Sequence, residues 1–332
     1  MLARLWRPEL GRDPGAAIAR ARLVSALGPL IALLLASLFF TIRTDRFLTA
    51  ENWSLIIQQV AVVGILAIGQ TLIILTAGVD LSNGAVMAFG TIAMTRLAVT
   101  YHLNPFLAIA LGIGVCLAFG LLNGFLVAGL RLPPFIVTLG TLNIAFALTH
   151  ITSNEETIAN LPDPLVFFGN TFRFAGTTIT YGSVLALALT VLTWFVLTRT
   201  VGGRHVYATG NNPDAARLAG VRTRRVLLGV YATAGLLYGI AALVLVGRTG
   251  VGDPQAGQSA NLDSITAVVV GGTSLFGGRG SVLGTLVGTL IVGIFRNGLT
   301  LLGVAAIYQF LITGVLVILA VAVDQLSRRR QA

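Results

Sequence analysis

The sequence predicts an all-α integral membrane protein with about ten transmembrane helices, some of them broken by glycine, and one short polar helix on the cytoplasmic side. Two observations predict this fold class. First, 55% of the 332 residues are hydrophobic, only 10% are charged, and the mean hydropathy is +0.88, far from the values of a soluble domain. Second, the apolar residues form repeated runs of about 20, the length that crosses a bilayer core as a helix.

Ten apolar stretches form one polytopic domain, residues 23–323. A basic N-terminal segment (1–22) precedes this domain, and a basic tail (324–332) follows it. The first stretch is kept as a helix, because it is long for a signal peptide and no small-residue cleavage site precedes Arg43. The stretches beginning near 84 and 262 are the shortest. The predicted spans are 23–42, 54–76, 84–100, 105–128, 134–152, 181–198, 226–247, 262–277, 281–298 and 304–323.

Arginine placement predicts the orientation. The chain carries a net charge of +10, and all of its 22 basic residues other than histidine are arginines. Basic residues favour the cytoplasmic side of a membrane. Ten crossings from a cytoplasmic N-terminus leave most of the arginines inside, in segments 1–22, 131, 199–225, 279 and 328–330. The membrane therefore accounts for the charge without nucleic acid, and both termini are expected in the cytoplasm.

The residue types that are missing exclude several functions. A chain without lysine has no Walker A loop and so no ATP site of that kind. Its single cysteine, Cys116, excludes a disulfide framework, and the three histidines are too scattered to suggest a metal site. We therefore expect no catalytic, cofactor or metal site, and a membrane enzyme is disfavoured because no nucleophile and base can be assembled.

Two glycine-rich interruptions stand where continuous helices would otherwise run. One covers residues 77–84 and the other residues 271–281, and the two look like weak internal echoes. Broken helices inside a membrane must be buried in protein or line a cavity, and paired breaks point to a transport path. The expected gate or helix-break residues are Gly78, Asp80, Ser82, Gly84, Gly271, Gly272 and Ser274.

Several polar side chains within these spans admit more than one interpretation. Asp80 is a helix cap for the segment starting near Ser82, a gating or conformational group, or a proton-coupling carboxylate. Amides in membrane helices are often hydrogen-bonding links between helices, but they also contact polar cargo. The candidates for lining a pore are Gln70, Asn123 and Asn143, and their spacing does not separate the two roles.

The polar, basic segment 199–225 contains one capped short helix. Asn212 is the expected N-cap, Pro213 the first helical residue and Gly220 the stop. A helix of about seven residues is marginal in water, because nucleation is costly. It is therefore expected to dock on a partner, although an ordinary positively charged loop is the simpler alternative.

Five motifs in order, over residues 50–305, carry a family resemblance. They are Leu75–Gly84 (LTAGVDLSNG), Leu121–Gly124 (LLNG), Leu132–Leu142 (LPPFIVTLGTL), Tyr207–Val221 (YATGNNPDAARLAGV) and Gly271–Gly284. The chain resembles the permease subunits of bacterial ABC importers for monosaccharides of the ribose, xylose, arabinose, galactose and fructose type, nearest the ribose and fructose branch. It departs from the family at Ala77 and Asn83, where a glycine and a valine are usual.

The resemblance implies a permease of the bacterial plasma membrane, paired with a second permease copy as a homodimer, a cytoplasmic ABC ATPase and an extracytoplasmic sugar-binding protein. The segment seated on the ATPase would comprise Gly210, Asn211, Asn212, Pro213, Asp214, Ala215, Ala216, Arg217 and Gly220. Two alternatives remain open. One is an ion-coupled secondary transporter, and the other is a related ABC permease for a nucleoside, an amino acid or a signalling sugar.

Overall fold

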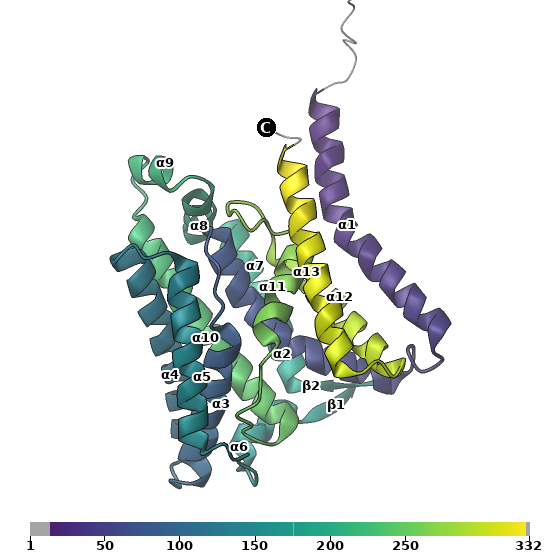
Figure 1. Cartoon of the computed structure of the whole chain (residues 1–332), viewed down its shortest axis with the longest axis vertical. Helices are drawn as coiled ribbons and strands as arrows, with labels where there is room; N and C mark the ends of the chain where they lie inside the picture. Colours follow the sequence, from purple (N-terminus) through teal and green to yellow (C-terminus); the bar gives the residue numbers. More distant parts are fainter. Residues whose placement is uncertain (1–13, 175, 330–332) are drawn as a thin grey trace, which may run out of the picture.

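The computed structural model describes residues 14–174 and 176–329, and within them it is a bundle of helices with one small hairpin (Figure 1). The all-α prediction is confirmed. Residues 1–13 and 330–332, which belong to the two basic end segments expected from the sequence, lie outside the described residues. Helix α1 (Pro14–Arg43) already begins within the expected N-terminal segment.

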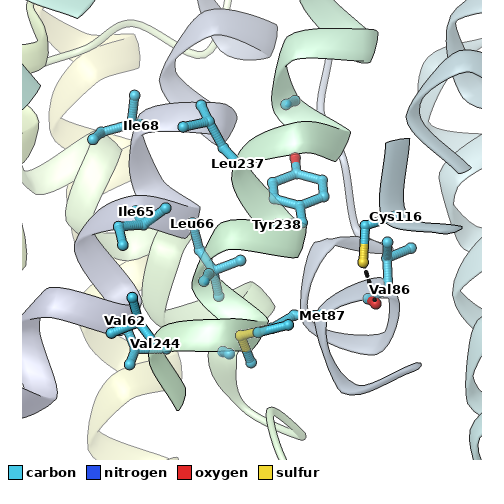
Figure 2. Close-up of a cluster of buried hydrophobic side chains, with 14 of the residues drawn as sticks. Val62, Ile65, Leu66, Ile68, Val86, Met87, Cys116, Leu237, Tyr238 and Val244 are labelled. Carbon is cyan, nitrogen blue, oxygen red and sulfur yellow. Dashed lines mark hydrogen bonds between the residues drawn. The ribbon is translucent and has the colours of Figure 1, made fainter. Parts of the chain in front are cut away.

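Two central helices, α2 and α10, organise one side of the bundle. Helix α10 (Thr223–Thr249) packs against α2 (Ala50–Leu75), α3 (Asn83–Val99) and α4 (Pro105–Gly124). Helix α4 continues into a π-helical turn, Phe125–Gly129. Helix α5 (Pro134–Ser153) lies mainly against α3, and α7 (Tyr181–Arg199) lies against α2. A buried apolar cluster joins α2, α3, α4 and α10, with Cys116 and Tyr238 in its interior (Figure 2).

Glycine permits a close contact between α4 and α10 in this half. A Cβ on Gly235 of α10 would lie 2.5 Å from the Cys116 carbonyl oxygen of α4, and one on Gly120 would lie 2.4 Å from the Tyr231 carbonyl oxygen. No larger residue fits either position without separating the helices. Small residues at such contacts are the usual means of close packing in membranes.

The other half contains α11 (Ala260–Val270), α12 (Val282–Leu301) and α13 (Ala306–Arg329). Helix α11 contacts α2, α12 and α13, and α1 contacts α12. A second apolar cluster, built around Phe40, Phe47, Ile56 and Ile294, joins α1, α2 and α12. Helix α2 therefore contacts both halves of the bundle.

The expected count of ten spans is not confirmed. Among the described residues, six helices are long and apolar enough to cross a membrane: α2, α4 with its π-helical turn, α5, α7, α10 and α12. The span expected at 262–277 is wrong as a continuous helix, because α11 ends at Val270 after 11 residues. Eleven residues rise about 16 Å, roughly half of a bilayer core. The glycines from 271 onward form a turn instead.

The short elements lie at the two ends of the bundle. At one end are α6 (Asp163–Val166), a 3₁₀ turn (Phe167–Gly169) and an antiparallel hairpin of β1 (Thr171–Phe174) and β2 (Thr177–Thr180), with Thr171 opposite Thr180. At the other end are α8 (Val201–Asn211) and α9 (Pro213–Leu218). The described start of α1 and the described end of α13 lie toward the α8–α9 end (Figure 1).

The course of the loop after α10 was not predicted. After α10 the chain continues without a helix through residues 250–259, which we call the re-entrant segment. Gly252 packs on Thr95 near the end of α3, and Gly257 packs on Gly84 at its start. Eleven helical residues separate those α3 positions, so the segment runs back about 17 Å along α3 before α11 begins.

Candidate functional site

The first break, Thr76–Ser82, joins α2 to α3 and is built around Asp80. One carboxylate oxygen, Oδ1, accepts hydrogen bonds from the Ser82 N–H (2.7 Å) and the Ser82 hydroxyl (2.6 Å). The other, Oδ2, accepts from the Tyr238 hydroxyl of α10 (3.2 Å). Only 1% of Asp80 is exposed. The carboxylate therefore fixes the residue that begins α3 and ties it to α10.

This geometry refines the expected cap at Asp80. Ser82 is the N-cap residue of α3, and its side chain makes no capping hydrogen bond to the first turn. Asp80 binds the N–H of Ser82 itself rather than the free amides of the first turn. Buried hydrogen-bonded networks of this kind fix one arrangement strongly when their members are satisfied. A gating role for Asp80 stays a prediction.

Amides on neighbouring helices complete the first break. In the orientation that satisfies both of its partners, the Gln70 amide accepts from the Asp80 N–H (3.2 Å) and donates to the Asp80 carbonyl (3.0 Å). The Asn123 amide of α4 donates to the Ser82 hydroxyl (3.1 Å). The Asn83 amide donates to Ser264 of α11 (2.8 Å). Helices α2, α4, α10 and α11 are thus all hydrogen-bonded to this break.

The three amides expected at a pore occupy different environments. Gln70 and Asn123 are buried within the chain and bind the first break. Asn143 is exposed on α5 and donates to the Leu139 carbonyl of its own helix (3.1 Å). The structure therefore brings two of these residues together with Asp80 and leaves the third on an open face.

The second break, Gly271–Ser281, is a tight glycine turn between α11 and α12. A Cβ on Gly271 would lie 2.4 Å from the Gly284 carbonyl oxygen, so the backbones of the two helix ends are in contact. The Ser274 N–H donates to the Arg279 carbonyl (2.9 Å) across the turn. Gly278 has a positive φ of +71°, and its N–H donates to the Leu75 carbonyl at the end of α2 (2.9 Å). The second break therefore reaches the helix that leads into the first.

The capped helix expected in segment 199–225 is confirmed as α9. The Asn212 side chain accepts from the N–H groups of Asp214 (3.1 Å) and Ala215 (3.0 Å), and Pro213 is the first helical residue. Gly220, with a φ of +85°, follows the helix end. Arg217 pairs with Asp214 on the exposed surface. Gly210 and Asn211 instead end α8, a helix that was not predicted, and Ala216 is buried.

Three distant segments meet at Leu75, Gly210 and Gly278, which we call the backbone junction. A Cβ on Gly210 would lie 1.8 Å from the Leu75 carbonyl oxygen and 2.9 Å from the Gly278 nitrogen. Nearby, the Tyr207 hydroxyl of α8 donates to the Gly280 carbonyl (2.9 Å). Burial raises the pKa of Tyr207 above its usual range. Helix α8 thus contacts the end of α2 and the second break together.

One arginine of this region has a structural role that the sequence did not indicate. The Arg224 guanidinium donates to the carbonyls of Ala128 and Gly129, each at 2.9 Å, at the end of the π-helical turn. Basic side chains commonly bind the free carbonyls at helix ends. Arg204, Arg217, Arg222 and Arg225 of the same basic segment are exposed.

Helix α8 contacts the end of α2, which leads into the first break, and it contacts the second break directly. A displacement of α8 and α9 can therefore be transmitted to both breaks. Comparison with known proteins bears on that possibility. Residues 52–321 match the family described as "Branched-chain amino acid transport system / permease component". The chain belongs to this permease family. The family predicted from the five motifs is confirmed at this level.

Curated relatives of the permease extend over most of its length. It is 47% identical over 308 residues to the fructose import permease protein FrcC of Rhizobium meliloti, covering 91% of this chain and 85% of the relative. It is 38% identical over 301 residues to the ribose import permease protein RbsC of Bacillus subtilis, covering 90% and 92%. It is 34% identical over 298 residues to the D-allose transport system permease protein AlsC of Escherichia coli, covering 89% and 90%. No solved structure matches significantly.

Sequence reasoning missed three features of this permease: α8, the backbone junction and the course of the re-entrant segment along α3. The signal for the re-entrant segment is present, since Gly250, Gly252, Pro254 and Gly257 lie within eight residues and exclude a helix. Its course along α3 is set by distant contacts, which local sequence does not carry. The backbone junction has no side-chain signature at all, because two of its three residues are glycines.

Proposed function

We propose that this permease is the transmembrane subunit of an ATP-binding cassette importer, and that it forms the translocation path for a monosaccharide. The observation that carries the proposal is the 47% identity to a fructose import permease over 91% of the chain. The other relatives named above import ribose and D-allose, so the proposed cargo is a neutral sugar rather than an amino acid. The subunit itself performs no covalent chemistry.

The energy source is proposed to be a separate ATPase docked on α8 and α9. Helix α9 is only two turns long, and Leu218 at its end is 90% exposed, an unusual position for a large apolar side chain. The exposed Arg217 lies on the same short helix. A partner surface with an apolar pocket and acidic side chains would cover both residues. The α8–α9 end is then the cytoplasmic end, as the arginine distribution predicts, and the chain lies in the bacterial plasma membrane.

Two further partners complete the proposed importer. A second copy of the permease would form the other wall of the path, as a homodimer, and an extracytoplasmic binding protein would deliver the sugar at the end that carries the β1–β2 hairpin. In this proposal Asn143 is the pore-lining amide, since it lies on the open face of α5. Gln70 and Asn123 instead maintain the first break, with Gly78, Asp80, Ser82 and Gly84 as its gate.

The ion-coupled alternative has less support. A proton-coupling carboxylate must exchange its proton with water during each cycle, whereas Asp80 is buried and hydrogen-bonded to Ser82 and Tyr238. The relatives named above are import permeases of the same size range, and the chain covers most of each. Direct measurement of the energy source separates the two mechanisms.

The test is uptake by the reconstituted system. The permease is placed in proteoliposomes with its ATPase and supplied with its binding protein, and radiolabelled D-fructose, D-ribose, D-allose and D-xylose are tested one at a time. We expect accumulation of at least one sugar that requires ATP and survives a proton uncoupler. Uphill accumulation by the permease alone, or uptake that collapses with the uncoupler while ATP persists, would contradict the proposal.

A further inference from the structure

We infer that a cavity between α3, α5 and the re-entrant segment is a contact site for the neutral sugar on its way through the permease. This inference rests on the proposed function and adds a specific site to it. Ala85 and Ala88 of α3, Leu142 and Phe146 of α5, and Gln258 and Asn261 beside the start of α11 are among the residues that line a cavity of about 130 Å³.

The depth of the re-entrant segment is the first step. Gly252 exchanges two backbone hydrogen bonds with Ile158, both 2.8 Å long, at the end of the bundle that carries the hairpin. Gly257 lies where a Cβ would be 2.9 Å from the Gly84 carbonyl oxygen, at the start of α3. Non-helical backbone thus runs alongside α3 over a length of about half of a bilayer core.

Lipid cannot cover such a segment. Backbone N–H and C=O groups that lack helical partners are tolerated at membrane depth only when they are buried in protein or line a water-filled cavity. Gln255 and Gln258 of this segment are exposed on the chain and bonded to each other. Exposed amides are costly against lipid tails. This face of the permease therefore faces the aqueous path.

The lining of the cavity fits a neutral sugar. Amide side chains such as Gln258 and Asn261 offer both donors and acceptors, which match hydroxyl groups of either role. Phe146, 49% exposed, offers an apolar face for the C–H surface of a sugar ring. None of the lining residues is charged. A zwitterionic amino acid would leave its carboxylate and ammonium groups unpaired here.

The cavity is also bonded to the first break. The Asn261 amide donates to the Leu81 carbonyl (3.3 Å), directly after Asp80. Gly84 and Gly257 pack against each other at the same place. Cargo that moved Asn261 would therefore act on the turn between α2 and α3, so the site lies where a bound sugar can influence the arrangement of the break.

Accessibility in the assembled complex is the first test. Cysteine is introduced as Gln258→Cys or Phe146→Cys, with Tyr101→Cys as an exposed helix-end control and Leu187→Cys, in the middle of α7, as an apolar-surface control; native Cys116 is buried and remains in place. A hydrophilic, lipid-impermeant methanethiosulfonate reagent should label the two cavity cysteines at least tenfold faster than Leu187→Cys. Cavity cysteines that react as slowly as Leu187→Cys, while Tyr101→Cys reacts, would overturn the inference.

Transport kinetics are the second test, with the sugar that the wild-type complex accumulates. Phe146→Ala and Gln258→Ala should each raise the KM for uptake about tenfold, and Phe146→Tyr should restore the KM. The matched control is Phe195→Ala on the exposed surface of α7. A KM for both cavity variants equal to that of Phe195→Ala would overturn the site. Failure of the wild type to accumulate any sugar would instead overturn the proposed function, and the labelling result is independent of it.

Discussion

The two predicted breaks look alike in sequence but are closed by different kinds of contact. At the first break, side chains from several helices surround one turn, with Asp80 at the centre and Gln70 and Asn123 around it. At the second, the main contacts are between backbones, as Gly271 meets Gly284 and Gly278 meets Leu75. The side-chain hydrogen bonds fix the first break at one position inside the bundle. The glycine turn of the second break instead packs its backbone against the backbone of other segments.

The difference suggests that the two breaks respond differently to movements of the helices around them. The first is enclosed by the bundle and moves only if its hydrogen bonds rearrange. The second lies against α8 and shares the backbone junction with it, so a displaced α8 acts directly on this break and on the end of α2. Four substitutions test this difference, in order of decreasing effect on stability.

Gly210→Ala should have the largest effect. The added Cβ would lie 1.8 Å from the Leu75 carbonyl oxygen, so α8 must separate from α2 and from the second break. We expect ATP-driven uptake below a tenth of wild type and a thermal unfolding midpoint lower by several degrees. Gly202→Ala is the matched control in the same helix, where the nearest atom is 3.6 Å away and alanine favours the helix by up to about 1 kcal/mol. Equal behaviour of the two variants would show that α8 does not hold the second break.

Asp80→Asn tests the first break. The variant preserves size, but its NH₂ group cannot accept the hydrogen bonds that one carboxylate oxygen receives. We expect a loss of about 1.5–3 kcal/mol in the free energy of unfolding, measured by denaturant titration in detergent. Tyr238→Phe removes one bond of the same network and should cost about 0.6–1.7 kcal/mol. Additive effects in the double variant would contradict a shared network.

Tyr207→Phe removes one side-chain hydrogen bond between α8 and the second break. The expected loss of unfolding free energy is about 0.5–1.5 kcal/mol, because one neutral hydrogen bond is lost and the ring is retained. We expect fewer sugars imported per ATP hydrolysed, measured as the ratio of the two rates in proteoliposomes. An unchanged ratio would mean that the backbone junction alone connects α8 to this break.

Arg217→Ala should have the smallest effect on stability and still uncouple transport. Its side chain is 63% exposed and paired only with Asp214 on the surface, so the free energy of unfolding should change by less than about 0.5 kcal/mol. Uptake per ATP should nevertheless fall several-fold if α9 docks on an ATPase. Arg224→Ala is the contrasting control, because that arginine binds two backbone carbonyls and its loss should lower stability. An unchanged ratio of uptake to ATP hydrolysis in Arg217→Ala would support the alternative that segment 199–225 is an ordinary basic loop without a docking role.

Local sequence patterns predicted the helices that are determined by their own residues, through a cap or through the length of an apolar run. The capped helix α9 followed from Asn212, Pro213 and Gly220, and the long apolar helices followed from their length. Helix α8 was missed because Gly202, Gly203 and Gly210 lower its helix propensity, and close packing such as that of Gly210 on Leu75 compensates. The sequence located the two breaks, but it did not indicate Tyr238, Ser264 and Leu75 as the partners of their residues. Such partners lie far along the chain, and spacing within one segment cannot reveal them.

Cys116 gives the permease a practical advantage for chemical experiments. Its thiol is buried against the Val86 carbonyl at 3.3 Å, inside the apolar cluster of Figure 2, and the chain has no lysine. Reagents that attack thiols or side-chain amines therefore meet almost no background on the native protein. A thiol-reactive probe can therefore be introduced at a single exposed position without removing Cys116 from the core.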